Sequence, residues 1–231
     1  AVLNATDKIK YNLMIFIKKH FNFNGNLIKY ENDNVIFGKN KITFKKLISL
    51  AYLNRIPLSS SGFYKTPKIF VDKKTLKGRP FLYFSYGAAV SEVIIDILTG
   101  ENKLTKVDIL HDVGNSINPN IDIGQIEGAF VQGLGWLTSE EVSWNNNGNL
   151  LVFSPSTYKI PVMNDIPTDF NVKIHKNKGN IEKTVNKSKA VGEPPLLLSL
   201  SVFLAIKNAI SYVKNNKKIN LVAPATPENI L

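Results

Sequence analysis

The spacing of apolar residues along the chain predicts helices and strands that do not follow a regular βαβ repeat. Helices are expected over four segments, residues 1–21, 44–53, 123–137 and 194–213. Thr43 and Asp122 each precede an apolar stripe of helical spacing, and both residue types are favoured as N-caps. The last helix is apolar almost all round as far as Ile206, so it is expected to be buried, with a lysine-rich run at 214–218 after its end.

Strands are expected where apolar and polar residues alternate or where β-branched and aromatic residues concentrate. Their ranges are 27–30, 35–37, 41–43, 80–98 (with a turn or bulge at Gly87), 104–113 and 171–175. Residues 54–80 are interrupted by proline and glycine, which indicates a loop-rich excursion. Strands and helices therefore occur in separate groups, and this arrangement predicts an α+β fold.

The composition is that of a folded chain without thiol chemistry. Its 231 residues are 44% hydrophobic and 20% charged, which is enough to bury a substantial core in one large domain. The absence of cysteine excludes disulfides, thiolate zinc sites and iron–sulfur ligation by this chain. No run of 18 uninterrupted apolar residues occurs, so no membrane-spanning helix is expected.

The formal net charge of +11 raises the possibility of nucleic-acid binding, but its composition argues against it. Arg55 and Arg79 are the only arginines, and all other basic residues are scattered lysines. Bidentate recognition of bases and phosphates favours arginine. The charge therefore predicts a solvated surface and no nucleic-acid partner.

The helix predicted over residues 123–137 carries an unusual set of small and polar residues. Gly124, Gly128 and Gly135 share one face, and Gln125 and Gln132 face one side together. Each glycine costs up to about 1 kcal/mol relative to alanine in a helix interior, so a close approach should offset it. Two readings remain open at this point: a large ligand that uses the amides, such as a pterin, or ordinary tight packing of two helices.

The second segment with chemical potential is 188–195, which places an acid directly before two prolines. Gly192 permits an unusual turn, and Pro194 and Pro195 are suited to the first positions of a helix. Glu193 is thereby expected at a helix N-terminus, where the helix dipole stabilises a carboxylate that can accept a proton. The competing reading is an ordinary helix start with an acidic cap.

The remaining polar residues give weaker signals. His20, His111 and His175 have no metal-ligand spacing, so no role is predicted for them. Asp108 and Asp112 flank a predicted strand and are expected to be solvated at its end.

Ordered matches along nearly the whole chain carry a family resemblance. Besides the Gln125 and Glu193 segments, they lie at residues 61–67, 78–84, 86–90, 99–102, 108–114, 135–138, 154–161 and 225–228. The chain resembles the molybdopterin-binding subunit of bacterial xanthine dehydrogenases, within the xanthine oxidase/aldehyde oxidase family. The resemblance implies that residues 1–231 are the C-terminal half of the molybdopterin-binding domain, a single incomplete domain from a longer protein or a truncated gene.

The resemblance also implies an activity and roles for individual residues. The family hydroxylates an electron-poor C–H carbon, here of xanthine or hypoxanthine, with oxygen from water. Glu193 matches the general base of the family, and Gln125 matches a residue that binds the pterin. Val191 and Gly192, beside Glu193, are expected to line the cofactor, and no metal ligand is expected from this chain.

The rest of the enzyme is expected to complete the site. The resemblance implies a molybdenum–molybdopterin cofactor completed by the preceding half of the domain, with 2Fe-2S and FAD on a partner subunit. It implies a cytoplasmic hetero-oligomer with no membrane partner, and an isolated chain that is inactive. Two alternatives remain open: a hydroxylase of aldehydes or other N-heterocycles, and a truncated chain without catalysis.

Overall fold

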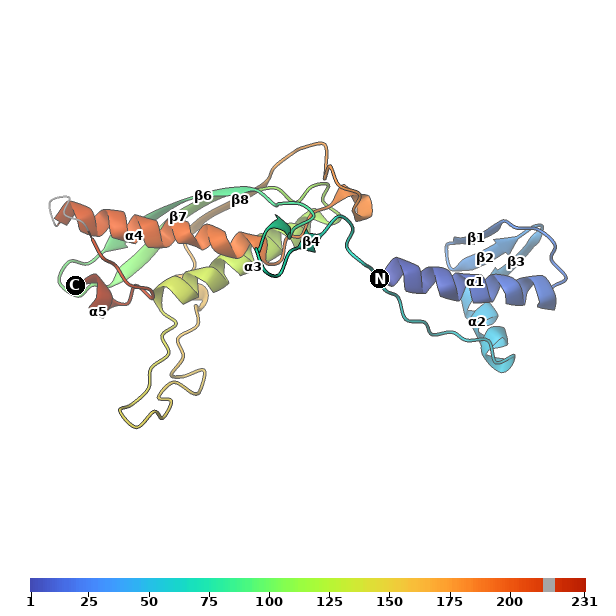
Figure 1. Cartoon of the computed structure of the whole chain (residues 1–231), viewed down its shortest axis with the longest axis horizontal. Helices are drawn as coiled ribbons and strands as arrows, with labels where there is room; N and C mark the ends of the chain where they lie inside the picture. The colour runs from blue at the N-terminus through green and yellow to red at the C-terminus, as the bar shows by residue number, and fades with distance from the viewer. Residues whose placement is uncertain (214–218) are drawn as a thin grey trace. The chain divides into compact units, whose positions relative to one another are not determined.

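The computed structural model describes residues 1–213 and 219–231, and the chain forms two compact units (Figure 1). Unit 1 is residues 1–80 and unit 2 is residues 81–231. The lysine-rich run expected at 214–218 lies outside the described residues. Each unit has its own hydrophobic core, and the assignment of both to one incomplete domain stays a prediction.

Unit 1 contains a three-stranded antiparallel sheet, and its strands lie between the two helices in the order of the sequence. Its elements are α1 (Val2–His20), β1 (Ile28–Glu31), β2 (Asn34–Phe37), β3 (Asn40–Thr43), α2 (Phe44–Leu53) and the two-residue strands β4 (Phe70–Val71) and β5 (Gly78–Arg79). The predicted cap is confirmed, because the Thr43 side chain accepts a hydrogen bond from the Lys46 N–H at 3.3 Å. The core is made by Leu13, Phe16, Ile17, Val35, Phe37, Leu47 and Ala51.

Unit 2 is a three-stranded mixed sheet with helices packed against it (Figure 1). Its elements are β6 (Gly87–Ile95), β7 (Asn102–His111), α3 (Pro119–Thr138), η1 (Met163–Asp165), β8 (Asp169–Ile174), η2 (Val185–Lys187), η3 (Pro194–Ser199), α4 (Leu200–Val213) and α5 (Pro227–Ile230). Strand β7 is central, antiparallel to β6 and parallel to β8. Helix α4 packs against β6, and α3 packs against β8 and η3.

The start of α3 differs from the sequence prediction. The helix begins at Pro119 and is capped by Asn118, whose side chain accepts a hydrogen bond from the Ile121 N–H at 3.4 Å. Proline at the first helical position needs no hydrogen-bond partner for its nitrogen, so the helix can start there. The predicted cap, Asp122, lies inside the first turn and instead accepts a hydrogen bond from the Ser116 hydroxyl at 2.5 Å.

The helix over residues 194–213 was expected to be buried all round, and this was wrong. Val202, Ile206 and Ile210 enter the core, whereas Leu197 and Leu204 are 66% and 60% exposed. Among the described residues, this stretch is long and apolar enough by composition to cross a bilayer, contrary to the expectation from uninterrupted runs. Core helices of soluble proteins can meet the same criterion, and in this helix 22% of the apolar window is buried.

The glycines of α3 fall into two groups that the helical pattern did not separate. A Cβ atom on Gly133 would overlap the Ser199 hydroxyl and would lie 2.6 Å from the Leu196 carbonyl oxygen, so η3 packs directly on the helix backbone there. Gly124 and Gly128, by contrast, have nothing within 4 Å of a built Cβ atom. Close packing is therefore found at Gly133, which was not singled out, and at the buried Gly135. Of the predicted face, only Gly124 and Gly128 are open.

His111 is a buried histidine at the end of β7. It is 1% exposed, pairs with Gly87 on β6, and neither ring nitrogen has a hydrogen-bond partner among the residues that the structure describes. Burial lowers the pKa of the imidazole below its usual value; the neighbouring Asp112 charge opposes this shift and Lys189 adds to it. The expectation that Asp112 is solvated was also wrong, because it is 5% exposed.

We expect opposite effects from alanine at the two kinds of glycine. Gly133→Ala should lower the free energy of unfolding by about 1–3 kcal/mol, because the new methyl group meets the η3 backbone. Gly128→Ala should raise it by up to about 1 kcal/mol through helix propensity. Urea unfolding of the chain followed by tryptophan fluorescence measures this, since Trp136 and Trp144 both lie in unit 2. Equal stability of the two variants would contradict the packing described.

We also expect His111 to make unit 2 less stable in mild acid. Its folded-state pKa is lowered, so the unfolded chain binds more protons below the unfolded pKa of about 6.5. Stability is therefore unaffected at pH 8 and falls as the pH drops below about 6.5, by at most about 1.4 kcal/mol per pH unit. His111→Leu should remove most of this slope between pH 6.5 and 5, whereas His175→Leu, at an exposed histidine, should keep it. An unchanged slope in His111→Leu would contradict the assignment.

Candidate functional site

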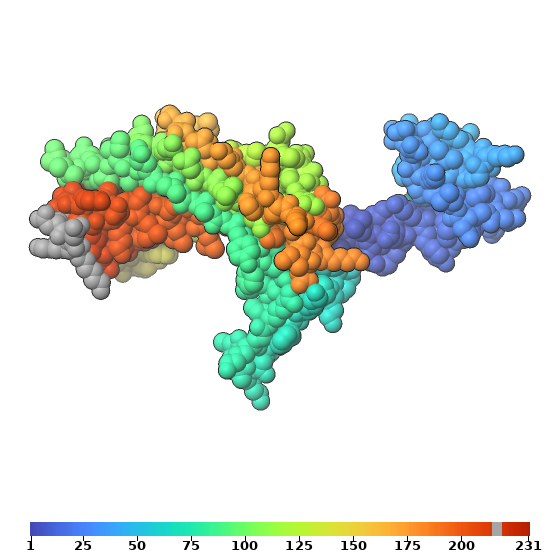
Figure 2. All heavy atoms as spheres, turned by 90° about the horizontal axis from the view of Figure 1, so that it is seen from above, coloured from blue at the N-terminus to red at the C-terminus, as the bar shows by residue number. Residues whose placement is uncertain are grey.

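The segment that precedes Glu193 is bound to the end of the central strand of unit 2. Gly114 and Ser188 form an antiparallel bridge, and the Lys189 N–H donates to the Val113 carbonyl at 2.8 Å. In Figure 2 the orange atoms of residues 175–190 lie beside the yellow-green atoms that follow β7. A segment about 75 residues away in sequence is thus held at the strand end.

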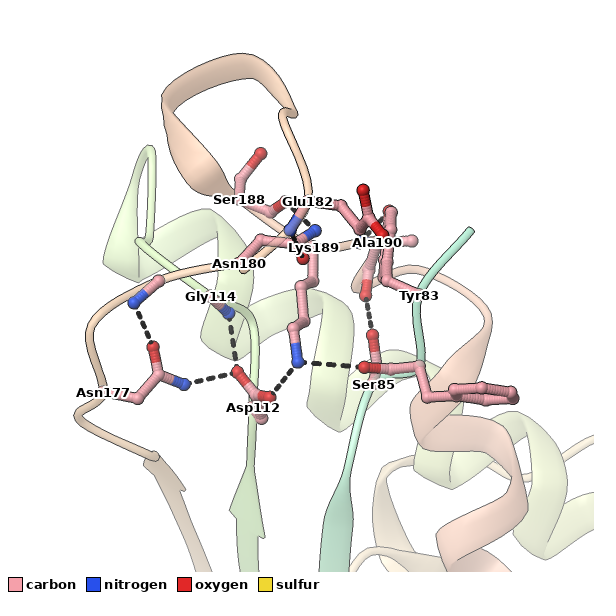
Figure 3. A network of polar contacts seen from close by, with 12 residues as sticks. Tyr83, Ser85, Asp112, Gly114, Asn177, Asn180, Glu182, Ser188, Lys189 and Ala190 are labelled. Carbon is pink, nitrogen blue, oxygen red and sulfur yellow. Dashed lines mark hydrogen bonds and ion pairs between the residues drawn. The ribbon is translucent and has the colours of Figure 1, made fainter. Parts of the chain in front are cut away.

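Two side chains from the stretch before β6 hold the next residue, Ala190. Its N–H donates to the Tyr83 hydroxyl at 3.0 Å, and the Ser85 hydroxyl donates to its carbonyl at 3.1 Å (Figure 3). Both backbone polar groups of Ala190 are therefore satisfied by side chains, which fixes the path of the chain toward Gly192.

A buried ion pair lies at the centre of these contacts (Figure 3). Lys189 Nζ is 2.5 Å from Asp112 Oδ2 and also donates to the Phe84 carbonyl at 2.9 Å. The Gly114 N–H and the Asn177 amide donate to Asp112 Oδ1 at 2.8 and 2.6 Å. The two charged side chains are only 10% and 7% exposed.

The hydrogen bonds keep Asp112 charged in spite of its burial. Burial raises the pKa of the carboxyl, but the hydrogen bonds from Lys189, Gly114 and Asn177 together lower it further, so that the net pKa is below the usual value. The pair is thus a charged, buried group held by several hydrogen bonds rather than a solvated strand end. The sequence did not predict this pair, because its two residues are 77 positions apart and no local pattern links them.

Glu193 begins the helix as predicted, but the helix end does not hold its side chain. It is the N-cap of η3, followed by Pro194 and Pro195, and its side chain makes no capping hydrogen bond. The two prolines have no N–H to donate, and the Leu196 N–H is used by the Glu193 backbone carbonyl at 3.1 Å. The carboxylate is exposed and has no hydrogen-bond or ion-pair partner among residues 1–213 and 219–231.

The structure brings Gln125 and Gly192 together. A Cβ atom on Gly192 would lie 3.2 Å from Gln125 Oε1, which is tighter than most such contacts, so the absence of a side chain allows this approach. Val191, the preceding residue, is half-buried and packs against the core of unit 2. All four site residues predicted from the sequence, Gln125, Val191, Gly192 and Glu193, are therefore at or next to one contact between α3 and the loop before η3.

The side of α3 that carries Gln125 is exposed along its length. We call it the open face of α3, and it consists of Ile121, Gln125, Gly128, Gln132 and Trp136. The spacing of three or four residues puts these side chains on one stripe of the helix. Gln125 and Gln132 are thus both exposed in this chain.

The open face has the chemistry to hold a flat heterocycle such as a pterin. The Gln125 amide offers two donors and an acceptor, and Gly128, with nothing within 4 Å of a built Cβ, lets a large group approach the helix backbone. The described residues contain no group of three or more histidine, cysteine, aspartate or glutamate side chains that could hold a metal ion.

Comparison with known sequences gives the family. The molybdopterin cofactor-binding domain family matches residues 1–167. Xanthine dehydrogenase/oxidase of Felis catus is 51% identical over 190 residues, which are 79% of this chain and 14% of that protein. Xanthine dehydrogenase 2 of Arabidopsis thaliana is 43% identical over 241 residues, which cover 100% of this chain and 16% of that protein. The chain thus spans about a seventh of the length of these relatives.

Solved structures share the fold at lower identity. Quinoline 2-oxidoreductase from Pseudomonas putida 86 matches with a TM-score of 0.64 and 20% identity, over 97% of this chain and 28% of that one. Reconstituted CO dehydrogenase from Oligotropha carboxidovorans matches with a TM-score of 0.60 and 21% identity, over 98% of this chain and 27% of that one. The predicted α+β fold of the cofactor-binding domain is confirmed. The chain belongs to the molybdopterin cofactor-binding domain family, in the molybdenum hydroxylases of the xanthine dehydrogenase/oxidase type.

Proposed function

We propose that the chain is part of an enzyme that hydroxylates an electron-poor C–H carbon of xanthine or hypoxanthine, with oxygen from water and with Glu193 as the general base. The identity of 43–51% to xanthine dehydrogenases and xanthine dehydrogenase/oxidases supports this substrate class. A purine carbon between two nitrogens is electron-poor, and a base positioned beside it favours transfer of oxygen to that carbon.

The single observation that carries the proposal is the contact between Gly192 and Gln125. It puts the residue before Glu193 within 3.2 Å, at a built Cβ, of an amide on the open face of α3. A carboxylate without a partner and a polar, glycine-bearing helix face therefore belong to the same site. A base and a cofactor-binding surface must be neighbours in a hydroxylase of this type.

The residues of the open face fit the organic part of the cofactor. When bound, the molybdenum–molybdopterin cofactor supplies the two-electron oxidation. Gln125 would hold the pterin through its amide, and Gly128 would leave room for it against the helix backbone. Val191 and Gly192 would line the cofactor on the loop side.

Glu193 would act on a proton. One of its carboxylate oxygens would accept the proton of the water-derived hydroxyl as that oxygen bonds to the substrate carbon. The hydrogen of the broken C–H bond would leave with its electron pair, and the cofactor, when bound, would take up the two electrons. The carboxylate has no partner among the described residues, so both oxygens are available for this step. A general base of this kind contributes typically about 10²–10⁴-fold to a rate.

The proposed reaction also needs parts of the enzyme that are outside this chain. We expect the other half of the domain to supply the remaining contacts to the metal, the pterin and the purine. We expect 2Fe-2S and FAD centres on a partner subunit of a cytoplasmic hetero-oligomer, and a bacterial origin. The residues that separate purines from aldehydes and other N-heterocycles would lie in that other half, so the alternative substrates are decided there.

We expect Glu193→Gln in the complete enzyme to lower turnover of xanthine or hypoxanthine by at least ~10²-fold, because an amide cannot accept the proton. Molybdenum and pterin content should stay near that of the parent enzyme. Steady-state turnover per bound molybdenum measures the effect. Glu141→Gln, at an exposed acid just beyond the other end of α3, is the matched control and should keep parental turnover.

Three outcomes would count against the proposal. Parental turnover in Glu193→Gln would remove this residue from the mechanism. A complete parent protein that binds the cofactor but oxidises aldehydes or quinoline and neither purine would reject the substrate class. A parent protein without molybdenum or turnover would favour the chain without catalysis.

A further inference from the structure

We propose that Lys189 and Asp112 are positioning residues for Glu193, and that their buried ion pair holds residues 188–193 so that the carboxylate stays beside the open face of α3. This inference rests on the proposed role of Glu193. It assigns a role to a charged pair that the hydroxylation chemistry does not itself use.

Lys189 joins three pieces of backbone at one point. Its N–H donates to the Val113 carbonyl at 2.8 Å, just after β7, and its Nζ donates to the Phe84 carbonyl at 2.9 Å, just before β6. The same Nζ is 2.5 Å from Asp112, which is in turn held by the Gly114 N–H at 2.8 Å. The Lys189 ammonium group therefore connects the segment before β6, at Phe84, with the segment after β7, at Asp112, and ties both to the loop before η3 (Figure 3).

The position of Glu193 depends on this connection because its own side chain has no anchor. The carboxylate makes no capping bond, and the two prolines after it offer no N–H. The position of the carboxylate is therefore set by the backbone. The nearest hydrogen bonds that hold this backbone on the N-terminal side are those of Lys189 and Ala190. A displacement of about 1 Å in a reacting group can cost on the order of 10²-fold in rate.

Because both charges are buried, removal of either partner is expected to lower the stability of the protein. Removal of one charged group leaves the other buried and unpaired, which is strongly unfavourable, whereas replacement of both by apolar groups of similar size is often tolerated. A cavity of about 670 Å³ is lined by both residues together with Tyr83, Phe84 and Tyr86. Apolar replacements at both positions can thus be accommodated beside aromatic neighbours.

These facts separate a positioning role from a purely structural one. The double variant Asp112→Leu/Lys189→Met should regain stability, since no charge is left unpaired. It cannot regain the hydrogen bonds from Nζ to Asp112 and to the Phe84 carbonyl. A positioning role therefore predicts that stability returns while catalysis does not.

The experiment uses the complete enzyme and compares Lys189→Met, the double variant and Lys183→Met, a control at an exposed lysine of the same loop. Molybdenum content, melting temperature, kcat per molybdenum and KM are measured. Hydrogen–deuterium exchange of the peptide over residues 186–196 gives a readout that does not depend on turnover.

We expect kcat per molybdenum to fall by at least ~10-fold in both Lys189→Met and the double variant, with KM within about 2-fold of the parent, because a misplaced base slows the chemical step. Amide exchange over 188–193 should be faster in both, and that of α3 unchanged. The melting temperature should fall in Lys189→Met and recover in the double variant. Lys183→Met should match the parent in every measurement.

The contrary results are distinct from failure of the proposed function. Parental kcat in a stable double variant, or unchanged exchange over 188–193, would overturn the positioning role. If Lys189→Met does not fold, the double variant alone decides. If Glu193→Gln keeps parental turnover in the same assay, the proposed function fails, while the exchange data still report whether the pair holds the segment.

Discussion

The buried ion pair between Lys189 and Asp112 is the interaction on which the geometry of the candidate site depends. Its two residues are 77 positions apart in sequence, and their contact at 2.5 Å brings the loop before η3 to the end of the central strand. From that anchor the chain runs through Ala190 and Gly192 to Glu193, whose carboxylate has no anchor of its own among the described residues. The hydrogen-bonded ion pair holds the backbone, and the Glu193 carboxylate makes no bond of its own. Both features suit a general base, whose backbone must be held in place while its oxygens stay available for a proton.

The exposed surfaces of unit 2 are consistent with a chain that spans about a seventh of its relatives. Ile121 and Trp136 on the open face of α3 are 60% and 52% exposed, and the two open glycines of the helix have no neighbours. We propose that this surface receives the cofactor and the other half of the domain. Such a group, approaching from outside this chain, would offset the cost that Gly124 and Gly128 impose on the helix.

Local patterns predicted local structure, and contacts between distant segments were missed. Helix α2 and its Thr43 cap follow from side chains within one turn, so the sequence was sufficient there. Asp112 and His111 were misjudged because a polar strand end is usually solvated, and nothing nearby in sequence indicates that residues 177–189 cover it. Gly133 was overlooked for the same reason, since its partner η3 follows some sixty residues later. The site residues were predicted through family resemblance, and the structure places two of them, Gln125 and Gly192, in contact.

The most direct test of the central claim is the distance between the Glu193 loop and α3. The chain has no cysteine, so an engineered pair would contain its only thiols. The measurement is the rate of disulfide formation in Gln125→Cys/Gly192→Cys, compared with Gln132→Cys/Gly192→Cys, in which one position is moved about 10 Å along the helix. We predict faster closure in the first pair than in the second. Equal rates, or closure only in the second pair, would contradict the placement of Gly192, and with it the loop that carries Glu193, beside Gln125.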